Sequence, residues 1–216
     1  MHKVVAIDGP AGSGKGTVAK LIAQKLNLTY IDTGAMYRAV AYATLKNNIA
    51  IDDKDAIVSL ARNCNIDFKD NKTYLNDEDI SHEIRTMEVT KIVSQISSIV
   101  ELRELLVEQQ REMGSKTDVV MEGRDITTVV FPDANYKFYL DASVEARALR
   151  RFKENQEKGI ESSYDEILEN IKKRDYNDMH KEVGSLTRTE DSAYIDSTNL
   201  TIDEVVNKMI EVIEGE

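Results

Sequence analysis

Short apolar runs alternate with longer amphipathic stretches along most of the chain. Five of these runs have the length and composition of buried strands, at residues 4–8, 28–32, 118–122, 136–140 and 194–196. The stretches between them show helical periodicity, which predicts an α/β fold with a mostly parallel sheet and helices on both faces. Such sheets bind ligands outside the carboxyl ends of their strands. Four runs end in an acid, so we expect the chemistry at that edge, near Asp8, Asp32, Glu122 and Asp196.

The segment between the second and third runs is longer than one crossover helix requires. It spans about 80 residues, whereas connections in compact domains are usually much shorter. Residues 66–80 break the helical rhythm and predict a β-hairpin around the turn Asp70-Asn71-Lys72. Helices are expected over residues 52–64, 86–99 and 100–113, with Gly114 as the C-terminal cap of the last. We therefore expect an inserted subdomain over the functional edge of the sheet.

Further helices are predicted after the fourth run. The first covers residues 143–159 and carries Arg147, Arg150 and Arg151 at helical spacing. Ser163 and Glu166 have the spacing of a capping box at the start of the next helix, and Thr201 and Glu204 repeat it at the start of the last. The chain thus offers an arginine-bearing helical hairpin before its last strand.

A glycine-rich loop follows the first run directly. Residues 9–17 have the spacing G-x-x-x-x-G-K of a phosphate-binding loop between a strand and a helix. Its glycines let backbone N–H groups point at phosphate oxygens, and Lys15 supplies a mobile positive charge. Gly16 follows the lysine, and the hydroxyl comes one place later, at Thr17. Switch GTPases usually carry Ser or Thr directly after the lysine, so this form is more typical of nucleotide-phosphorylating enzymes.

Composition narrows the class of partner. Acidic residues outnumber basic ones by 39 to 28, giving a net charge of −11, which argues against a nucleic-acid backbone or an anionic membrane as the main partner. The 216 residues suffice for one buried α/β core with smaller insertions. The single cysteine, Cys64, excludes an internal disulfide and lies in an apolar helical pattern. With no apolar run of membrane length and no extended apolar seam, we expect a cytoplasmic, monomeric enzyme.

Polar groups capable of binding a second phosphate lie outside the loop. Arg38 follows the second run, and Arg124 follows the third within Glu122-Gly123-Arg124-Asp125; guanidinium groups bind phosphate through a bidentate fork. Arginines on the later hairpin, joined by Arg174, could stabilise charge on a migrating phosphoryl group. Helix caps, structural ion pairs and surface salt bridges remain alternatives for any single member, including the pair Asp178 and Lys181. The three histidines show no metal-ligand spacing.

These stretches together resemble the bacterial cytidylate kinases over nearly the whole chain. The resemblance rests on Ile7-Asp8-Gly9-Pro10 through Gly14-Lys15-Gly16-Thr17, Asp32-Thr33-Gly34-Ala35-Met36-Tyr37-Arg38, Gly123-Arg124-Asp125-Ile126, the stretch 128–134 and Asp141-Ala142-Ser143. It implies a three-layer P-loop NTPase-type fold with a five-stranded parallel sheet. A single domain would comprise a core (about 1–34, 115–150 and 186–216), a monophosphate-binding insertion (about 35–114) and a short helical lid (about 151–185).

The resemblance also implies a reaction and a set of site residues. The γ-phosphoryl group of ATP would pass to CMP or dCMP with the help of Mg²⁺. ATP would be bound by Gly9, Pro10, Ala11, Gly12, Ser13, Gly14, Lys15, Gly16 and Thr17, with Thr17 on the magnesium side. The catalytic set would be Lys15, Arg124, Arg151 and Arg174. CMP would be bound by Thr33, Arg38, Ser94, Arg103, Arg124, Asp125, Asp178 and Lys181.

Preference for cytosine has a physical reason as well. The carboxylate of Asp125 can accept from the exocyclic amine of cytosine, whereas uracil presents a carbonyl oxygen there. Two facing acceptors leave a buried polar group unpaired, which should disfavour UMP strongly. The chain departs from the family pattern at Glu122, Thr127, Lys181 and Ser185, where Asp, Gly, Arg and Pro are usual.

Two rival functions fit less well. A GTPase switch would need an Asn-Lys-x-Asp stretch for guanine, and Asn71-Lys72-Thr73-Tyr74 fails at its last position. No Asp-x-x-Gly follows the loop either. Another small-molecule kinase, such as an adenylate or shikimate kinase, is disfavoured by the long insertion and by Gly123-Arg124-Asp125.

Overall fold

A five-stranded parallel sheet forms the centre of the computed structural model, which describes residues 2–215. The strand order is β2-β6-β1-β7-β8, with bounds β1 Val4–Asp8, β2 Thr29–Asp32, β6 Val119–Gly123, β7 Tyr136–Asp141 and β8 Ala193–Asp196. All five predicted strands are therefore confirmed, and so is the fold class. The register aligns Asp8 of β1 with Gly123 of β6 and Asp32 of β2 with Glu122 of β6, so these strand ends and their acids meet at one edge.

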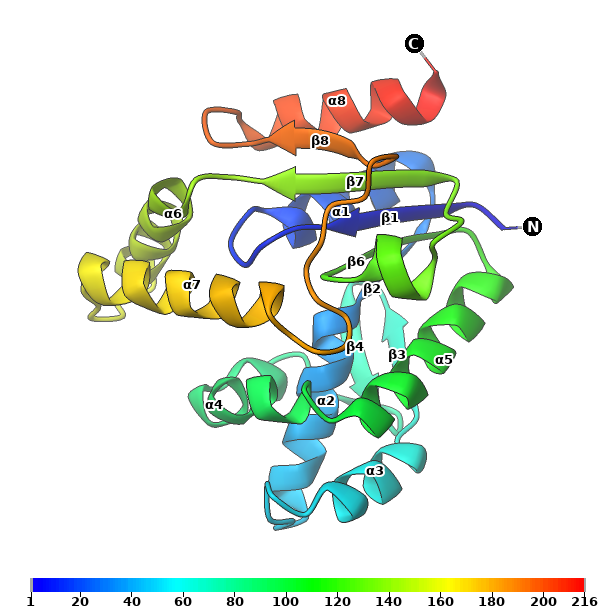
Figure 1. The fold of residues 1–216 in the computed structure, drawn as a ribbon, viewed down its shortest axis with the longest axis vertical. Helices are drawn as coiled ribbons and strands as arrows, with labels where there is room; N and C mark the ends of the chain where they lie inside the picture. Colours follow the sequence, from blue (N-terminus) through cyan, green and yellow to red (C-terminus); the bar gives the residue numbers. More distant parts are fainter. Residues whose placement is uncertain (1, 216) are drawn as a thin grey trace.

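Helices cover both faces of this sheet (Figure 1). On one face, α1 (Lys15–Leu26) and α8 (Ile202–Glu214) pack side chains such as Val18 and Met209 against Phe138 of β7. On the other, α5 (Val100–Lys116) and the short turn η2 (Ile126–Val130) pack against β1 and β6. The capping box predicted for α8 is present, with Thr201 and Glu204 bonded reciprocally.

The long segment between β2 and β6 has a hydrophobic core of its own. Its elements are α2 (Thr33–Lys46), α3 (Lys54–Arg62), β3 (Ile66–Lys69), β4 (Lys72–Leu75), β5 (Glu78–Asp79), η1 (Glu83–Arg85), α4 (Met87–Ile96) and α5. The predicted hairpin is confirmed, with Asp70 and Asn71 at φ 52° and 61° in its turn. A third strand, β5, extends the hairpin and was not predicted. Cys64 is buried, as its pattern indicated.

Two predictions of helix ends are wrong. Gly114 does not cap α5, which continues to Lys116; a Cβ at this position would lie 2.6 Å from Cζ of Phe131. Glycine is present there because an aromatic ring packs against the helix backbone, which sequence spacing does not reveal. The side chain of Ser163 makes no capping hydrogen bond at α7 (Tyr164–Met179), so the capping box predicted at 163–166 is absent.

The helices α6 (Val144–Glu157) and α7 pack against each other beyond the carboxyl ends of the strands (Figure 1). In Figure 1 the loop from α7 back to β8 passes in front of the strands of the sheet. Within residues 2–215, no helix has the length and apolar composition needed to span a bilayer.

Candidate active site

The phosphate loop is fixed by close backbone contacts at the end of β1. Gly9 has φ 152°, and a Cβ there would lie 2.0 Å from the carbonyl oxygen of Leu140, so only glycine fits. The following helix begins with the Val18 amide donating to the Gly14 carbonyl at 3.0 Å. Thr17 lies exposed in the first turn of α1, while the hydroxyl of Ser13 is buried and has no hydrogen-bond partner among the described residues.

Lys15 is buried within this loop, with 5% of its surface exposed. Its Nζ donates to the carbonyl of Pro10 at 2.9 Å. Burial and, next, the positive charge of Arg124 lower the pKa of Lys15 to about 7, and Arg174 acts in the same direction. The charges of an arginine after β6 and an arginine of α7 therefore act on Lys15, although the three residues are distant in the sequence.

Two acids at the strand ends differ in their roles. Asp8 is fully buried and accepts from the Ile126 and Thr127 amides at 2.9 and 2.8 Å and from Thr127 Oγ1 at 2.7 Å. It therefore holds η2 and, with it, the adjacent stretch 123–125. Glu122 lies beside the phosphate loop, since a Cβ on Gly16 would be 3.2 Å from Glu122 Oε1. Burial and, secondly, the charge of Asp32 raise the pKa of Glu122.

The start of α2 carries the first set of predicted acceptor residues. Asp32 caps the helix by accepting from the Ala35 amide at 2.9 Å, and its other oxygen accepts from Arg38 Nη2 at 2.7 Å. Thr33 Oγ1 donates to the Glu122 carbonyl at 2.8 Å. This bond requires Gly123, because a Cβ there would lie 2.6 Å from Thr33 Oγ1. The carboxyl end of β2 is thus joined to the carboxyl end of β6.

Arg124 and Lys181 meet at one carboxylate. Arg124 Nε donates to Asp178 Oδ2 at 2.8 Å, and Lys181 Nζ lies 3.1 Å from Asp178 Oδ1. Burial opposes ionisation of Asp178, but the charges of these two neighbours outweigh it and lower its pKa. The pair Asp178 and Lys181 is therefore a largely buried ion pair joined to Arg124, and not the solvated surface pair that sequence spacing left open.

Arg103 and Asp125 form a buried ion pair through Nη2 and Oδ2. Arg103 also donates from Nη1 to the Ser97 carbonyl at 3.1 Å and lies with its guanidinium carbon 5.5 Å from the centre of the Tyr37 ring. Burial raises the pKa of Asp125, while Arg103 acts against that shift. Ser94 lies exposed on α4, where its carbonyl accepts from Ser97 Oγ at 3.0 Å.

The arginines of the α6–α7 pair have distinct environments. Arg174 is exposed as a whole residue. Even so, desolvation of its guanidinium and, next, the positive charge of Arg124 lower its pKa. Arg151 points to solvent and pairs with Glu154 at 3.2 Å on its own helix. Arg150 donates to the carbonyl of Ser197. Of the two predicted lid arginines, the structure therefore brings only Arg174 close to Lys15 and Arg124.

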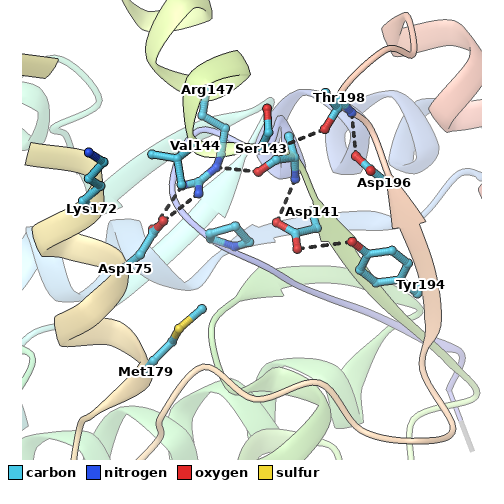
Figure 2. A pocket seen from close by; sticks show the side chains of 12 residues that line it. Asp141, Ser143, Val144, Arg147, Lys172, Asp175, Met179, Tyr194, Asp196 and Thr198 are labelled. Atoms are coloured by element: carbon cyan, nitrogen blue, oxygen red, sulfur yellow. Dashed lines mark hydrogen bonds and ion pairs between the residues drawn. The ribbon is translucent and has the colours of Figure 1, made fainter. Parts of the chain in front are cut away.

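Arg147 has a structural role that sequence reasoning missed. Its guanidinium makes a bidentate pair with Asp175 at 3.1 and 2.6 Å and donates to the carbonyls of Ala11 and Ala142 at 3.0 and 2.9 Å. Figure 2 shows this pair between α6 and α7, beside a cavity of about 500 Å³ to which the phosphate loop contributes Pro10. The helical spacing of Arg147, Arg150 and Arg151 gave no signal that the first is only 3% exposed.

Solved structures share the fold at low sequence identity. An uncharacterised protein from Eubacterium ventriosum ATCC 27560 has a TM-score of 0.55 and 13% identity, covering 100% of both chains. A sugar kinase from Janibacter sp. HTCC2649 has a TM-score of 0.50 and 13% identity, covering 99% of this chain and 95% of that one. These likenesses concern the fold alone.

Sequence relatives are far more similar. A cytidylate kinase from Clostridioides difficile (strain 630) is 49% identical over 210 residues, which cover 97% of each chain. The cytidylate kinase of Lactobacillus johnsonii is 51% identical over 214 residues, covering 97% of this chain and 93% of the relative. The family model described as cytidylate kinase matches residues 5–215. The resemblance is confirmed, and the chain belongs to the cytidylate kinase family.

Proposed function

We propose that the protein transfers the γ-phosphoryl group of ATP to CMP or dCMP, giving ADP and CDP or dCDP. The proposal rests on family membership and on one observation: the charges of Arg124 and Arg174 act on the buried Lys15 of the phosphate loop, in a chain with net charge −11. In a protein with a large net negative charge, a local group of positively charged side chains is expected where two polyanionic substrates meet. The GTPase alternative has no observation in its favour.

The phosphate loop fits the donor nucleotide. Two buried donors there can bind further acceptors. The Ser13 hydroxyl has no partner among the described residues, and the Lys15 ammonium donates to the Pro10 carbonyl with other N–H groups to spare. The N-terminus of α1 adds backbone N–H groups aimed at anions. In this proposal the loop residues 9–17 hold the donor phosphates, and Lys15 neutralises charge that develops on the transferred group.

The same region fits Mg²⁺, which prefers oxygen ligands and retains waters and phosphates around it. Thr17 offers an exposed hydroxyl, and Glu122 places a carboxylate beside Gly16. Asp8 is unsuited, because its oxygens already accept three hydrogen bonds. When bound, Mg²⁺ would supply charge neutralisation to the donor phosphates; Thr17 and Glu122 are the residues proposed to hold it, directly or through water.

The acceptor phosphate would be held by arginines from three elements. Arg38 of α2, Arg124 after β6 and Arg174 of α7 carry the fork geometry that phosphate requires, and Arg151 would join them when α6 and α7 move. An acceptor oxygen then attacks the γ-phosphorus as the bond to the β-phosphate oxygen breaks and ADP leaves. The arginines and Lys15 orient this in-line transfer and exclude water, so that ATP is not hydrolysed.

The cytosine base would be bound by the buried pair Arg103 and Asp125, and Thr33 and Ser94 would complete the set of residues that recognise it. The carboxylate of Asp125, held by Arg103 through one oxygen, can accept from the cytosine amine through the other. Asp178 and Lys181 would lie at the ribose side. The division into core, insertion and lid, the monomeric state and the cytoplasmic location stay predictions.

A coupled ADP-release assay tests the proposal. CMP, dCMP, UMP, AMP and GMP are offered singly with ATP and Mg²⁺. We expect rapid ADP release with CMP or dCMP and much slower release with UMP. Slow hydrolysis that no monophosphate accelerates would favour a switch GTPase or ATPase, and preference for AMP would indicate an adenylate kinase.

A further inference from the structure

The segment that follows α7 lies directly on the Arg103–Asp125 pair. We call residues 180–186 the covering segment. At its centre, Gly184 has φ 67°, and a Cβ there would lie 1.9 Å from Arg103 Nη2 and 2.3 Å from Asp125 Oδ2. Heavy atoms cannot approach so closely, so a side chain at residue 184 would force either the backbone of this segment or the Arg103 and Asp125 side chains to shift, in addition to the strain at positive φ.

The covering segment is fixed to the acceptor side of the site at both ends. Lys181 Nζ pairs with the Asp178 carboxylate at 3.1 Å, and the Leu186 amide donates to the Asp178 carbonyl at 2.8 Å. Asp178 itself binds Arg124 at 2.8 Å. The position of the segment is therefore linked to the residues proposed to hold the acceptor nucleotide.

The pair beneath this segment is largely shielded from water. Arg103 and Asp125 are only 5% and 6% exposed. Ser185 follows Gly184, so no proline favours extended backbone at position 184, and the left-handed conformation is accessible. Shielding matters for selectivity, because a mismatched base costs most when its unpaired polar groups cannot bond water instead.

We propose that Gly184 is a specificity-determining residue, which lets the covering segment close on Arg103 and Asp125 and keep water from the atoms that read the base. This inference rests on the proposed function and assigns the role to a position outside the predicted site. A side chain at 184 lifts the segment, admits water to the pair and reduces the penalty on a base with a carbonyl in place of the amine.

The test compares Gly184→Ala with Gly159→Ala as a matched control. Gly159 lies in the turn between α6 and α7 at the same φ of 67°, but a Cβ there meets nothing within 4 Å. The control therefore carries the backbone strain without the steric contact. We expect Gly184→Ala to lower kcat/KM for CMP by about tenfold or more and to narrow the CMP-to-UMP ratio, while Gly159→Ala leaves the ratio unchanged.

The outcomes separate the inference from the proposed function. If the unmodified protein phosphorylates neither CMP nor dCMP, the proposed function fails. If it discriminates between CMP and UMP and Gly184→Ala keeps that ratio, the role of Gly184 alone is refuted. Should Gly184→Ala not fold, Gly184→Asn replaces it, since Asn tolerates positive φ better but still brings a Cβ. Failure of both to fold, with Gly159→Ala folded, would show that Gly184 serves the fold and not selectivity.

Discussion

Lys15 shows how the interior of the protein changes the chemistry of a single side chain. Burial and the neighbouring Arg124 lower its pKa to about 7 from an ordinary value of 10.5. Between these values the unfolded chain binds a proton that the folded chain does not, so stability should rise with pH across that range. Donor phosphates would reverse the shift, because a nearby anion favours the protonated amine.

Binding of ATP should therefore take up a proton at pH 8. There Lys15 is mostly neutral in the free protein and charged in the complex, whereas at pH 6 it is already charged and uptake should vanish. Calorimetric titration in buffers of different ionisation enthalpy measures the uptake, which we expect to be at least about half a proton. The Lys15→Met protein supplies the control, and equal uptake in it would assign the proton to another group.

Lys15→Met should also slow turnover. Loss of a charge aimed at the transferred phosphoryl group commonly costs about 10²-fold or more in kcat. Steady-state rates at saturating ATP and CMP measure the effect, with thermal unfolding to confirm the fold. Turnover within about twofold of the unmodified enzyme would contradict the role proposed for this lysine.

Asp125 is the residue on which selection of cytosine should depend. Asp125→Ala removes the acceptor and should lower the ratio of kcat/KM for CMP to kcat/KM for UMP by about tenfold or more. Because the substitution leaves Arg103 buried without its partner, Asp125→Asn is a second variant that keeps shape while removing charge. An unchanged ratio in both would show that the base is read elsewhere.

At the scale of elements, α5 shows tertiary packing overriding a local signal. Gly114 is typical of a helix end, yet the helix continues to Lys116, and glycine is present because the ring of Phe131 occupies the space where a side chain would point. The hairpin of β3 and β4 illustrates the opposite case. Its turn residues Asp70 and Asn71 adopt positive φ locally, so the sequence was sufficient to predict it.

Gly114→Ala should therefore destabilise the protein. An open helix position would gain roughly 1 kcal/mol from this substitution, whereas overpacking against Phe131 should cost about 1–3 kcal/mol. Urea unfolding measures the free energy of unfolding. The double variant with Phe131→Leu should recover part of the loss, and strict additivity of the two changes would argue against direct contact.

At the scale of the whole molecule, Arg147 joins three parts of the structure. Its guanidinium connects α6 to Asp175 of α7 and to the Ala11 carbonyl of the phosphate loop. The orientation of the helical pair is thus tied to the loop by groups 136 and 28 residues away from the arginine.

Arg147→Met should be severely destabilising, since it leaves the buried Asp175 carboxylate without its partner. Removing one member of a buried pair typically costs about 3–5 kcal/mol. Urea unfolding tests this, and Arg147→Met with Asp175→Asn should be less destabilised than the sum of the single changes. A loss below about 1 kcal/mol, as for an exposed pair, would show that the contact contributes little.

Local information determined much of this protein. Hydrophobic periodicity predicted all five strands of the parallel sheet, because buried strands and amphipathic helices impose different spacings on the chain. Likewise, the spacing of Gly9 to Thr17 was sufficient to predict a phosphate loop, although Gly9 itself is required by the distant Leu140 carbonyl. The capping box at Thr201 belongs to the same class, whereas the one expected at Ser163 did not form.

Only the tertiary structure decided which polar groups meet. Arg147 lies in a buried ion pair with Asp175, whereas Arg151 of the same helix lies in solvent. The fold also places Gly184 directly against Arg103 and Asp125. Burial and the charges of Arg124 and Arg174 likewise lower the pKa of Lys15, and the spacing of these residues in the sequence does not predict that shift. These features depend on distances between residues far apart in the chain, and such distances are set by packing of the whole fold.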